Sequence, residues 1–365
     1  MFDLLRLLMS RAGTLVSHDV LIAEVWGGRI VSDAAISARI SAARAAIGDD
    51  GTAQRYIRTV PRRGFRFEAP VTVEEAGAPT DTGAQQQVGF CRSADGTRIA
   101  FARSGSGPPL LRAGHWLTHL EHDWASPIWH PILEEFGRYF SLIRYDQRGN
   151  GLSDRAVEAL DRDAFVADLE AVAAAAGHPR FLLYGTSQGA PVAIAYAARH
   201  PERVAGLILH GGYERGRRLR ESPGEAEMAA ALETMIREGW GQPGTAFLRA
   251  FAALFIPGGT SEQIASLAAL QRMTTTVEMA ARLRRAVDGF KVSAEEMAGV
   301  RCPTLVLHAR EDAVHPLDQG RALAAGIPGA AFVELDSANH VILPQEPAWQ
   351  VMFDAIRRFA GAVEL

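Results

Sequence analysis

A serine on a glycine-flanked turn is the residue of this sequence with the clearest potential for chemistry. The stretch F-L-L-Y-G-T-S-Q-G-A spans 181–190 and places Ser187 between Gly185 and Gly189. Apolar residues precede it and an alanine-rich helical segment follows, which predicts a strand, a sharp turn and a helix. On such an elbow the hydroxyl projects from the sheet, and the glycines leave room for strand and helix to approach. Ser187 could therefore act as a nucleophile, and the N–H of Gln188 could bind an oxyanion.

An acid and a histidine follow the serine in the order that such an elbow requires. Asp312 ends A-R-E-D, after the apolar run P-T-L-V-L-H, and His340 ends D-S-A-N-H, after a second predicted strand at 331–335. Serine, acid and histidine, each after a strand, form the arrangement of elbow hydrolases. The sequence therefore predicts a catalytic triad of Ser187, Asp312 and His340, which needs no cofactor and no metal.

The loop after the strand 109–113 should supply the second oxyanion N–H. It reads A-G-H-W-L-T-H-L-E-H-D-W, and the donor should lie near His115 or Trp116, with Trp116 favoured. The spacing of His115, His119 and His122 would also suit a metal site. Neutral histidines that line a pocket are the commoner case, and we interpret these three in that way.

Composition separates two parts of the chain. The 365 residues are 48% hydrophobic and suffice for roughly two domains. The net charge is −4, but residues 1–70 carry +3 and the remainder −7, so the basic excess is confined to the N-terminal part. Two distant cysteines and the lack of a signal or membrane-spanning segment favour a cytoplasmic protein without disulfides and without membrane association.

The N-terminal part has the pattern of three helices followed by a basic hairpin. Helical spacing covers 2–9, 18–26 and 34–47, and the alternating runs Y-I-R-T-V and G-F-R-F flank P-R-R. The run V-S-H-D-V-L-I-A-E-V-W-G, the third helix and the I-R-T-V…R-G-F-R-F wing resemble the C-terminal winged-helix DNA-binding domain of OmpR/PhoB-type response regulators. The resemblance covers 2–68 and implies a small α+β domain, 1–70, that binds DNA.

By that resemblance the third helix enters the major groove and the wing reaches phosphate or the minor groove. The implied DNA contacts are Ser37, Arg39, Ser41, Arg44, Arg62 and Arg63. Paired half-sites on DNA would require a homodimer. The alternative is a winged helix that binds protein, or binds nothing.

The remaining chain begins with a small, polar, aperiodic linker at 71–87. After it, predicted strands alternate with helices, which implies a mostly parallel sheet. The motifs Y-D-Q-R-G-N-G-L-S-D, G-T-S-Q-G, H-P-E-R-V-A-G-L-I-L, A-R-E-D and S-A-N-H together resemble the α/β-hydrolase fold. The resemblance implies an α/β domain at 88–365, with helices on the sheet and a helical cap at about 212–301 that controls substrate access.

Three functions remain open at this stage. The chain could be a one-component transcriptional regulator whose hydrolase-like domain binds and hydrolyses a small ester, lactone or thioester. It could be a metabolic esterase, lactonase or thioesterase with a vestigial or protein-binding winged helix. It could also be a regulator that senses its ligand without catalysis. The intact triad favours catalysis, and the wing favours regulation.

Overall fold

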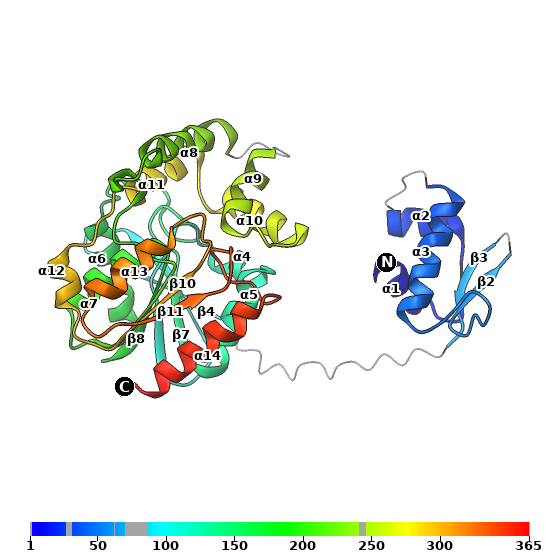
Figure 1. Ribbon diagram of the computed structural model, residues 1–365, viewed down its shortest axis with the longest axis horizontal. Helices are drawn as coiled ribbons and strands as arrows, with labels where there is room; N and C mark the ends of the chain where they lie inside the picture. The colour runs from blue at the N-terminus through cyan, green and yellow to red at the C-terminus, as the bar shows by residue number, and fades with distance from the viewer. Residues whose placement is uncertain (1, 27–30, 62, 70–85, 241–245, 365) are drawn as a thin grey trace. The chain divides into compact units, whose positions relative to one another are not determined.

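The computed structural model describes residues 2–26, 31–61, 63–69, 86–240 and 246–364. The chain forms two compact units, Met1–Gly83 and Ala84–Leu365 (Figure 1). Most of the expected linker, 71–87, lies outside the described residues.

The first unit is a three-helix domain with a small antiparallel sheet. Its elements are α1 (Phe2–Ser10), β1 (Leu15–Val16), α2 (His18–Trp26), α3 (Asp33–Ala46), β2 (Ile57–Val60) and β3 (Gly64–Phe67). The strand order is β1-β3-β2, so β1 adds a short third strand to the predicted hairpin. The side chain of Ser32 accepts a hydrogen bond from the Ala35 N–H and caps α3. Ile36 and Ile40 of α3 are buried in the apolar core of this unit. The expected winged-helix layout is confirmed.

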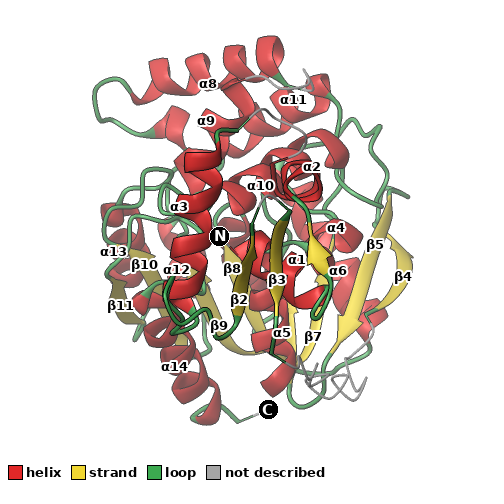
Figure 2. Cartoon of the chain, turned by 90° about the vertical axis from the view of Figure 1, so that its right-hand side faces the viewer, coloured by secondary structure: helices red, strands yellow, loops and turns green. Residues whose placement is uncertain are grey.

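The second unit is built on an eight-stranded sheet. The strands are β4 (Gln87–Arg92), β5 (Arg98–Ser104), β6 (Pro109–Arg112), β7 (Ser141–Tyr145), β8 (Phe181–Thr186), β9 (Val204–His210), β10 (Thr304–Ala309) and β11 (Ala331–Leu335). Their order is β11-β10-β9-β8-β6-β7-β5-β4, with β4 and β5 at one edge and β11 at the other (Figure 2). The six strands from β6 to β11 run parallel, and β4 and β5 pair antiparallel. Because these six strands are parallel, the loops after them meet at one edge of the sheet.

Helices pack against both faces of this sheet. They are α4 (Leu120–Ala125), α5 (Trp129–Tyr139), α6 (Arg162–Ala176), α7 (Gly189–Arg199), α13 (Leu317–Gly326) and α14 (Pro347–Gly361). On one face α5 meets α14, where the rings of Phe136 and Phe353 lie 5.3 Å apart. On the other face α6 packs against α7, which lies directly on β8. The central strands β8, β9 and β10 are therefore buried along their whole length.

A helical insertion separates β9 from β10. It contains the short 3₁₀ helix η1 (Arg217–Leu219), α8 (Glu225–Gly239), α9 (Ala246–Phe255), α10 (Ser261–Thr274), α11 (Val277–Val287) and α12 (Ala294–Gly299). Helices α8 and α11 pack together at the top of Figure 1, beyond the ends of the strands. The insertion is helical, as the sequence pattern predicts. Among the described residues, no helix combines the length and apolarity needed to cross a membrane.

Candidate active site

The turn after β8 has the backbone geometry of a strained elbow. Ser187 has a φ of +53°, a left-handed conformation that a non-glycine residue rarely adopts. A Cβ on Gly185 would lie 2.8 Å from the carbonyl oxygen of Gly189, and one on Gly189 would lie 2.9 Å from the carbonyl oxygen of Gly114. Strand and helix therefore approach more closely than larger residues would allow, and this approach fixes the position of the serine.

Asp312 and His340 form a close pair after β10 and β11. The Nδ1 of His340 lies 2.6 Å from Oδ2 of Asp312, and both side chains are buried. The other carboxylate oxygen, Oδ1, accepts hydrogen bonds from the N–H groups of Val314 (2.8 Å) and His315 (3.0 Å). Burial alone would raise the pKa of Asp312, but His340, the N–H of His315 and the charge of His308 hold it below its ordinary value. The carboxylate is thus ionised at neutral pH and can orient the imidazole.

Ser187 contacts a histidine that the sequence analysis did not predict. Its Oγ lies 3.4 Å from Nε2 of His315, while Nε2 of His340 has no hydrogen-bond partner among the described residues. Ser187 and His340 both line one cavity, but no hydrogen bond joins them. The signal for His315 was the motif E-D-A-V-H-P, which places a histidine three residues after Asp312.

Of the two expected oxyanion donors, Gln188 follows Ser187 in the chain and Trp116 lines the same cavity as Ser187. Gln188 precedes the first residue of α7, and Trp116 is buried in the loop after β6. The backbone N–H groups of both residues donate to no other group in the described part of the chain. The carbonyl of Trp116 accepts from the side chains of Gln147 (3.2 Å) and Asn150 (3.1 Å), and these contacts hold the loop in place.

The cavity at Ser187 has mostly apolar walls. It is lined by His115, Trp116, Leu117, Ile128, Trp129, Thr186, Ser187, Phe255, Ile256, Leu267, Gln271, His340 and Val341. The ring nitrogens of His115 and both carboxamide atoms of Gln271 are buried without a protein partner among the described residues. Burial, followed by the charge of Arg112, keeps the pKa of His115 well below its ordinary value. The cavity therefore suits an apolar ligand that carries a few polar atoms.

The three loop histidines have separate surroundings. The ring of His115 lies 4.7 Å from that of Trp129, while Nδ1 of His119 accepts from the N–H of His122. The ring of His122 hydrogen-bonds to the carbonyl of Ser266 at 3.1 Å. No group of three or more His, Cys, Asp or Glu side chains in the described residues is arranged to hold a metal ion.

The loop after β7 is held in place by hydrogen bonds of Asp146 and Arg148. The carboxylate of Asp146 accepts from the N–H groups of Leu120 (3.1 Å) and Leu152 (2.8 Å). Arg148 donates twice to Asp168, at 2.9 and 2.6 Å, and both of these side chains are fully buried. Neither Asp146 nor Arg148 lines the cavity at Ser187, so both support the loop structure.

The residues expected to contact DNA divide into two groups. Ser37, Arg39 and Ser41 are exposed on α3, and Arg63 is exposed between β2 and β3. Arg62 lies outside the described residues.

Arg44 does not lie where the expected DNA contact requires it. Its guanidinium is buried and donates to the carbonyl of Ile57 (3.1 and 2.7 Å) and to the hydroxyl of Thr59 (2.9 Å). Arg44 thus ties α3 to β2 and does not lie on the exposed face of the helix, so we remove it from the proposed DNA contacts.

Comparison with protein families matches both units. The model of the alpha/beta hydrolase fold matches residues 120–347. The model of the C-terminal domain of transcriptional regulatory proteins matches residues 1–67. The chain therefore carries both domains that the sequence motifs indicated.

Individual proteins match the hydrolase unit. A putative carbamate hydrolase RutD from Azorhizobium caulinodans is 27% identical over 271 residues, which are 71% of this chain and 94% of the relative. A pimeloyl-[acyl-carrier protein] methyl ester esterase from Nitrosomonas europaea is 27% identical over 264 residues, 71% of this chain and 99% of the relative. The solved structure of an esterase from Exiguobacterium antarcticum superposes with a TM-score of 0.64 at 19% identity. It covers 76% of this chain and 100% of the esterase, and it shows the shared fold.

Proposed function

The chain belongs to the alpha/beta hydrolase fold family, and from this premise we propose a one-component transcriptional regulator with a working hydrolase domain. In this proposal the winged helix binds DNA, and the hydrolase domain binds and hydrolyses a small ester, lactone or thioester. The observation that carries the proposal is the strained Ser187 beside the Asp312–His340 pair, in one chain with a regulatory DNA-binding domain.

The proposed reaction is nucleophilic attack by Ser187 on a carbonyl carbon. As the Oγ–C bond forms, the hydroxyl proton passes to Nε2 of His340 and the carbonyl π electrons move to oxygen. The N–H groups of Gln188 and Trp116 bind that oxyanion, and Asp312 stabilises the imidazolium. Collapse expels the leaving group, which takes the proton from His340. Water then releases the acyl group by the same steps in reverse order.

Support for a carbonyl substrate comes from the relatives and from the cavity. The relatives include a putative carbamate hydrolase and a methyl ester esterase, and carbamates and methyl esters both contain a carbonyl carbon bonded to oxygen. The mostly apolar walls of the cavity suit the hydrocarbon part of a small acyl compound.

Support for DNA binding comes from the first unit. Ser37, Arg39 and Ser41 are exposed on the helix that such domains place in the major groove, and Arg63 is exposed on the wing. In the proposal these residues contact DNA, and a homodimer binds paired half-sites.

A second candidate is a metabolic hydrolase whose winged helix no longer binds DNA. One observation favours it: with Arg44 buried, Arg39 is the single arginine that α3 exposes. A helix with so little positive charge gains little from phosphate contacts.

The first experiment is hydrolysis of p-nitrophenyl acetate, butyrate and octanoate by the wild type and by Ser187→Ala. We expect turnover by the wild type and a loss on the order of 10⁴-fold or more in the variant. Turnover that persists in Ser187→Ala would exclude this serine as the nucleophile. No turnover by the wild type would instead favour a regulator that senses without catalysis.

The second experiment measures binding to the DNA upstream of the gene at several salt concentrations. We expect affinity that falls as salt rises, and an Arg63→Ala variant with weaker binding and a flatter salt slope. Ser187→Ala should bind as the wild type does. Absence of salt-dependent binding together with ester turnover would favour the metabolic hydrolase.

A further inference from the structure

A second imidazole lies against the nucleophile. Nε2 of His315 is 3.4 Å from Oγ of Ser187, and the rings of His315 and His340 are 5.3 Å apart in an edge-to-face arrangement. His315 is buried, with 3% of its surface exposed, and its ring packs 4.4 Å from that of Tyr213. The mechanism above uses His340 as the base and leaves His315 without a role.

Arg220 determines which nitrogen of His315 carries the proton. An Nη2 group of Arg220 lies 2.7 Å from Nδ1 of His315. A guanidinium has only donors, so Nδ1 must accept this hydrogen bond and be unprotonated. Burial, the charge of His340 and the charge of Arg220 keep the pKa of His315 well below its ordinary value, so the ring is neutral. Its single proton is therefore on Nε2, which faces Ser187.

We propose that His315 is a second catalytic histidine whose Nε2–H donates to Oγ of Ser187, and that Arg220 is the positioning residue that fixes its tautomer. The proposal rests on the hydrolase function proposed above. With one lone pair of Oγ bound to His315, the hydroxyl proton is free to point toward Nε2 of His340. As that proton leaves, the N–H of His315 stabilises the negative charge that develops on Oγ. The proton of His315 itself is not transferred.

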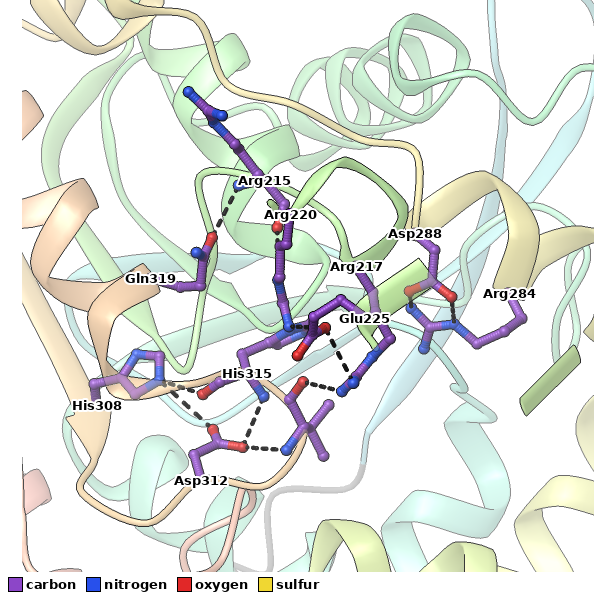
Figure 3. Close-up of polar contacts among 11 residues, drawn as sticks. Arg215, Arg217, Arg220, Glu225, Arg284, Asp288, His308, Asp312, His315 and Gln319 are labelled. Carbon is purple, nitrogen blue, oxygen red and sulfur yellow. Dashed lines mark hydrogen bonds and ion pairs between the residues drawn. The ribbon is translucent and has the colours of Figure 1, made fainter. Parts of the chain in front are cut away.

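The backbone around His315 is fixed to the same acid as His340. Its N–H donates to Oδ1 of Asp312, whose Oδ2 binds His340, so one carboxylate positions both imidazoles. Its carbonyl accepts from Nε2 of His308 at 2.8 Å (Figure 3). This backbone arrangement suits a directed contact between His315 and Ser187.

The contact also connects the nucleophile to the helical insertion. Arg220 lies just after η1 and shares Glu225 with Arg217, each at 3.1 Å. Arg217 donates to the carbonyl of Val314 at 3.0 Å, which ties the insertion to the loop that carries His315. Figure 3 shows Arg217, Arg220 and Glu225 gathered above His315. The tautomer of His315 is thus correct only when the insertion is in place.

Four variants test the role of His315 and Arg220. His315→Leu removes the donor, and His315→Gln restores an N–H at a similar distance. Arg220→Met removes the tautomer-fixing contact, and Arg220→Lys keeps a donor and its charge. The matched controls are Arg215→Met, a half-buried neighbour that pairs with Glu221, and His200→Gln, which pairs with Glu170 at the far end of α7. Thermal unfolding of each variant verifies the fold.

The first readouts are kcat/KM for p-nitrophenyl butyrate and the rate at which a fluorophosphonate labels Ser187. A hydrogen bond to a developing charge contributes about 10- to 100-fold, so His315→Leu should slow both by that factor, mainly through kcat. His315→Gln should recover most of the loss, and the controls should match the wild type. Unchanged or faster labelling of folded His315→Leu would overturn the proposal, because the histidine would then be structural or inhibitory.

Arg220→Met also tests the tautomer through turnover. Without the donor at Nδ1, the single proton of His315 can move to that nitrogen and leave Nε2 without its N–H. The kcat/KM for p-nitrophenyl butyrate at pH 7 should therefore fall in Arg220→Met, while Arg220→Lys should retain more of it. A wild-type kcat/KM in folded Arg220→Met would remove Arg220 from the proposal.

A spectroscopic readout works without turnover. Long-range ¹H–¹⁵N spectra of the full chain report the tautomer of each histidine, and the signal missing in His315→Gln identifies His315. At pH 7 we expect the Nε2–H form in the wild type and a mixture of tautomers in Arg220→Met. An Nδ1–H or doubly protonated ring in the wild type would overturn the proposal.

If the wild type neither hydrolyses esters nor reacts with the fluorophosphonate, the hydrolase function fails, and with it the catalytic role of His315. The spectra would then still decide whether Arg220 fixes the tautomer.

Discussion

In the hydrolase unit all three proposed triad residues are buried, whereas in the first unit Ser37 and Arg39 of the proposed DNA surface are exposed on α3. The elbow is specified by backbone geometry, since Ser187 needs a left-handed φ and a close strand–helix approach. A recognition surface is specified only by which side of a helix remains uncovered. Chemistry that depends on a strained backbone is therefore easier to predict from sequence than contacts that depend on exposure.

Each unit also contains a buried arginine that joins two elements. Arg148 is fully buried and binds a charged partner, the carboxylate of Asp168. Arg44 is buried beside β2 and binds the carbonyl of Ile57, a neutral partner. Both arginines join two elements, but they differ in the group that their loss would leave without a partner. Loss of Arg148 would leave a buried carboxylate, and loss of Arg44 would leave a buried carbonyl.

The largest expected effect tests the buried site of the hydrolase unit. Asp312→Asn should reduce kcat for a p-nitrophenyl ester on the order of 10⁴-fold, as loss of the acid does in a protease triad, because His340 loses its tautomer and its charge stabilisation. The exposed neighbour Glu311 provides the control, and Glu311→Gln should retain wild-type activity. A decrease of less than tenfold in Asp312→Asn would mean that His340 is not the general base.

The next effect tests the buried arginine of the hydrolase unit. Arg148→Met leaves the carboxylate of Asp168 buried without its partner, which should lower the free energy of unfolding by about 3–5 kcal/mol. Asp95 also contacts Arg148 but is 44% exposed, so Asp95→Asn should cost less than about 1 kcal/mol. Denaturant titration measures both values. Equal losses in the two variants would contradict the assignment of Asp168 as the critical partner.

A smaller loss is expected for the buried arginine of the first unit. Arg44→Met removes the donors to the carbonyl of Ile57, and an unsatisfied buried carbonyl costs about 1–3 kcal/mol. Arg39→Met, on the exposed face of the same helix, should leave stability unchanged and weaken DNA binding. If Arg39→Met destabilised the unit and Arg44→Met did not, the assignment of the two faces of α3 would be wrong.

The sequence predicted the fold and much of the site because the motifs encode local geometry. The elbow at Ser187, and the placement of Asp312 and His340 after successive strands, follow from residue order and strand pattern. The prediction that Arg44 contacts DNA is wrong, because Ile40 and Ile47 lie one helical turn away on either side of it. That spacing places it at the edge of the buried stripe, and its contact with β2 appears only in the folded unit.

His315 was missed for a different reason. The motif E-D-A-V-H-P places it close to Asp312, but its role depends on Arg220, which lies 95 residues earlier in the sequence. Neither strand order nor periodicity predicts which arginine of a helical insertion reaches a particular ring. The tautomer of His315 depends on this three-dimensional contact, which the sequence does not show.

The smallest effect concerns a neutral histidine buried in the hydrolase unit. Burial, with His340 and His308, lowers the pKa of His210 to about 3, whereas an unfolded histidine titrates near about 6.5. Between these values the unfolded chain binds a proton that the folded unit does not, so stability falls as pH decreases below 6.5. The contribution of His210 at pH 5.5 relative to neutral pH is about 1.4 kcal/mol.

His210→Gln should remove that part of the acid destabilisation, because its side chain does not titrate. Denaturant titrations of wild type and variant at pH 7.5 and 5.5 measure the difference. His130 is exposed, and His130→Gln should keep the wild-type pH dependence. An unchanged pH dependence in His210→Gln would mean that His210 takes up its proton in the folded state as readily as in the unfolded chain. The surroundings of His210 would then admit water more readily than its burial indicates. The difference between the buried site of the hydrolase unit and the exposed surface of α3 would be smaller.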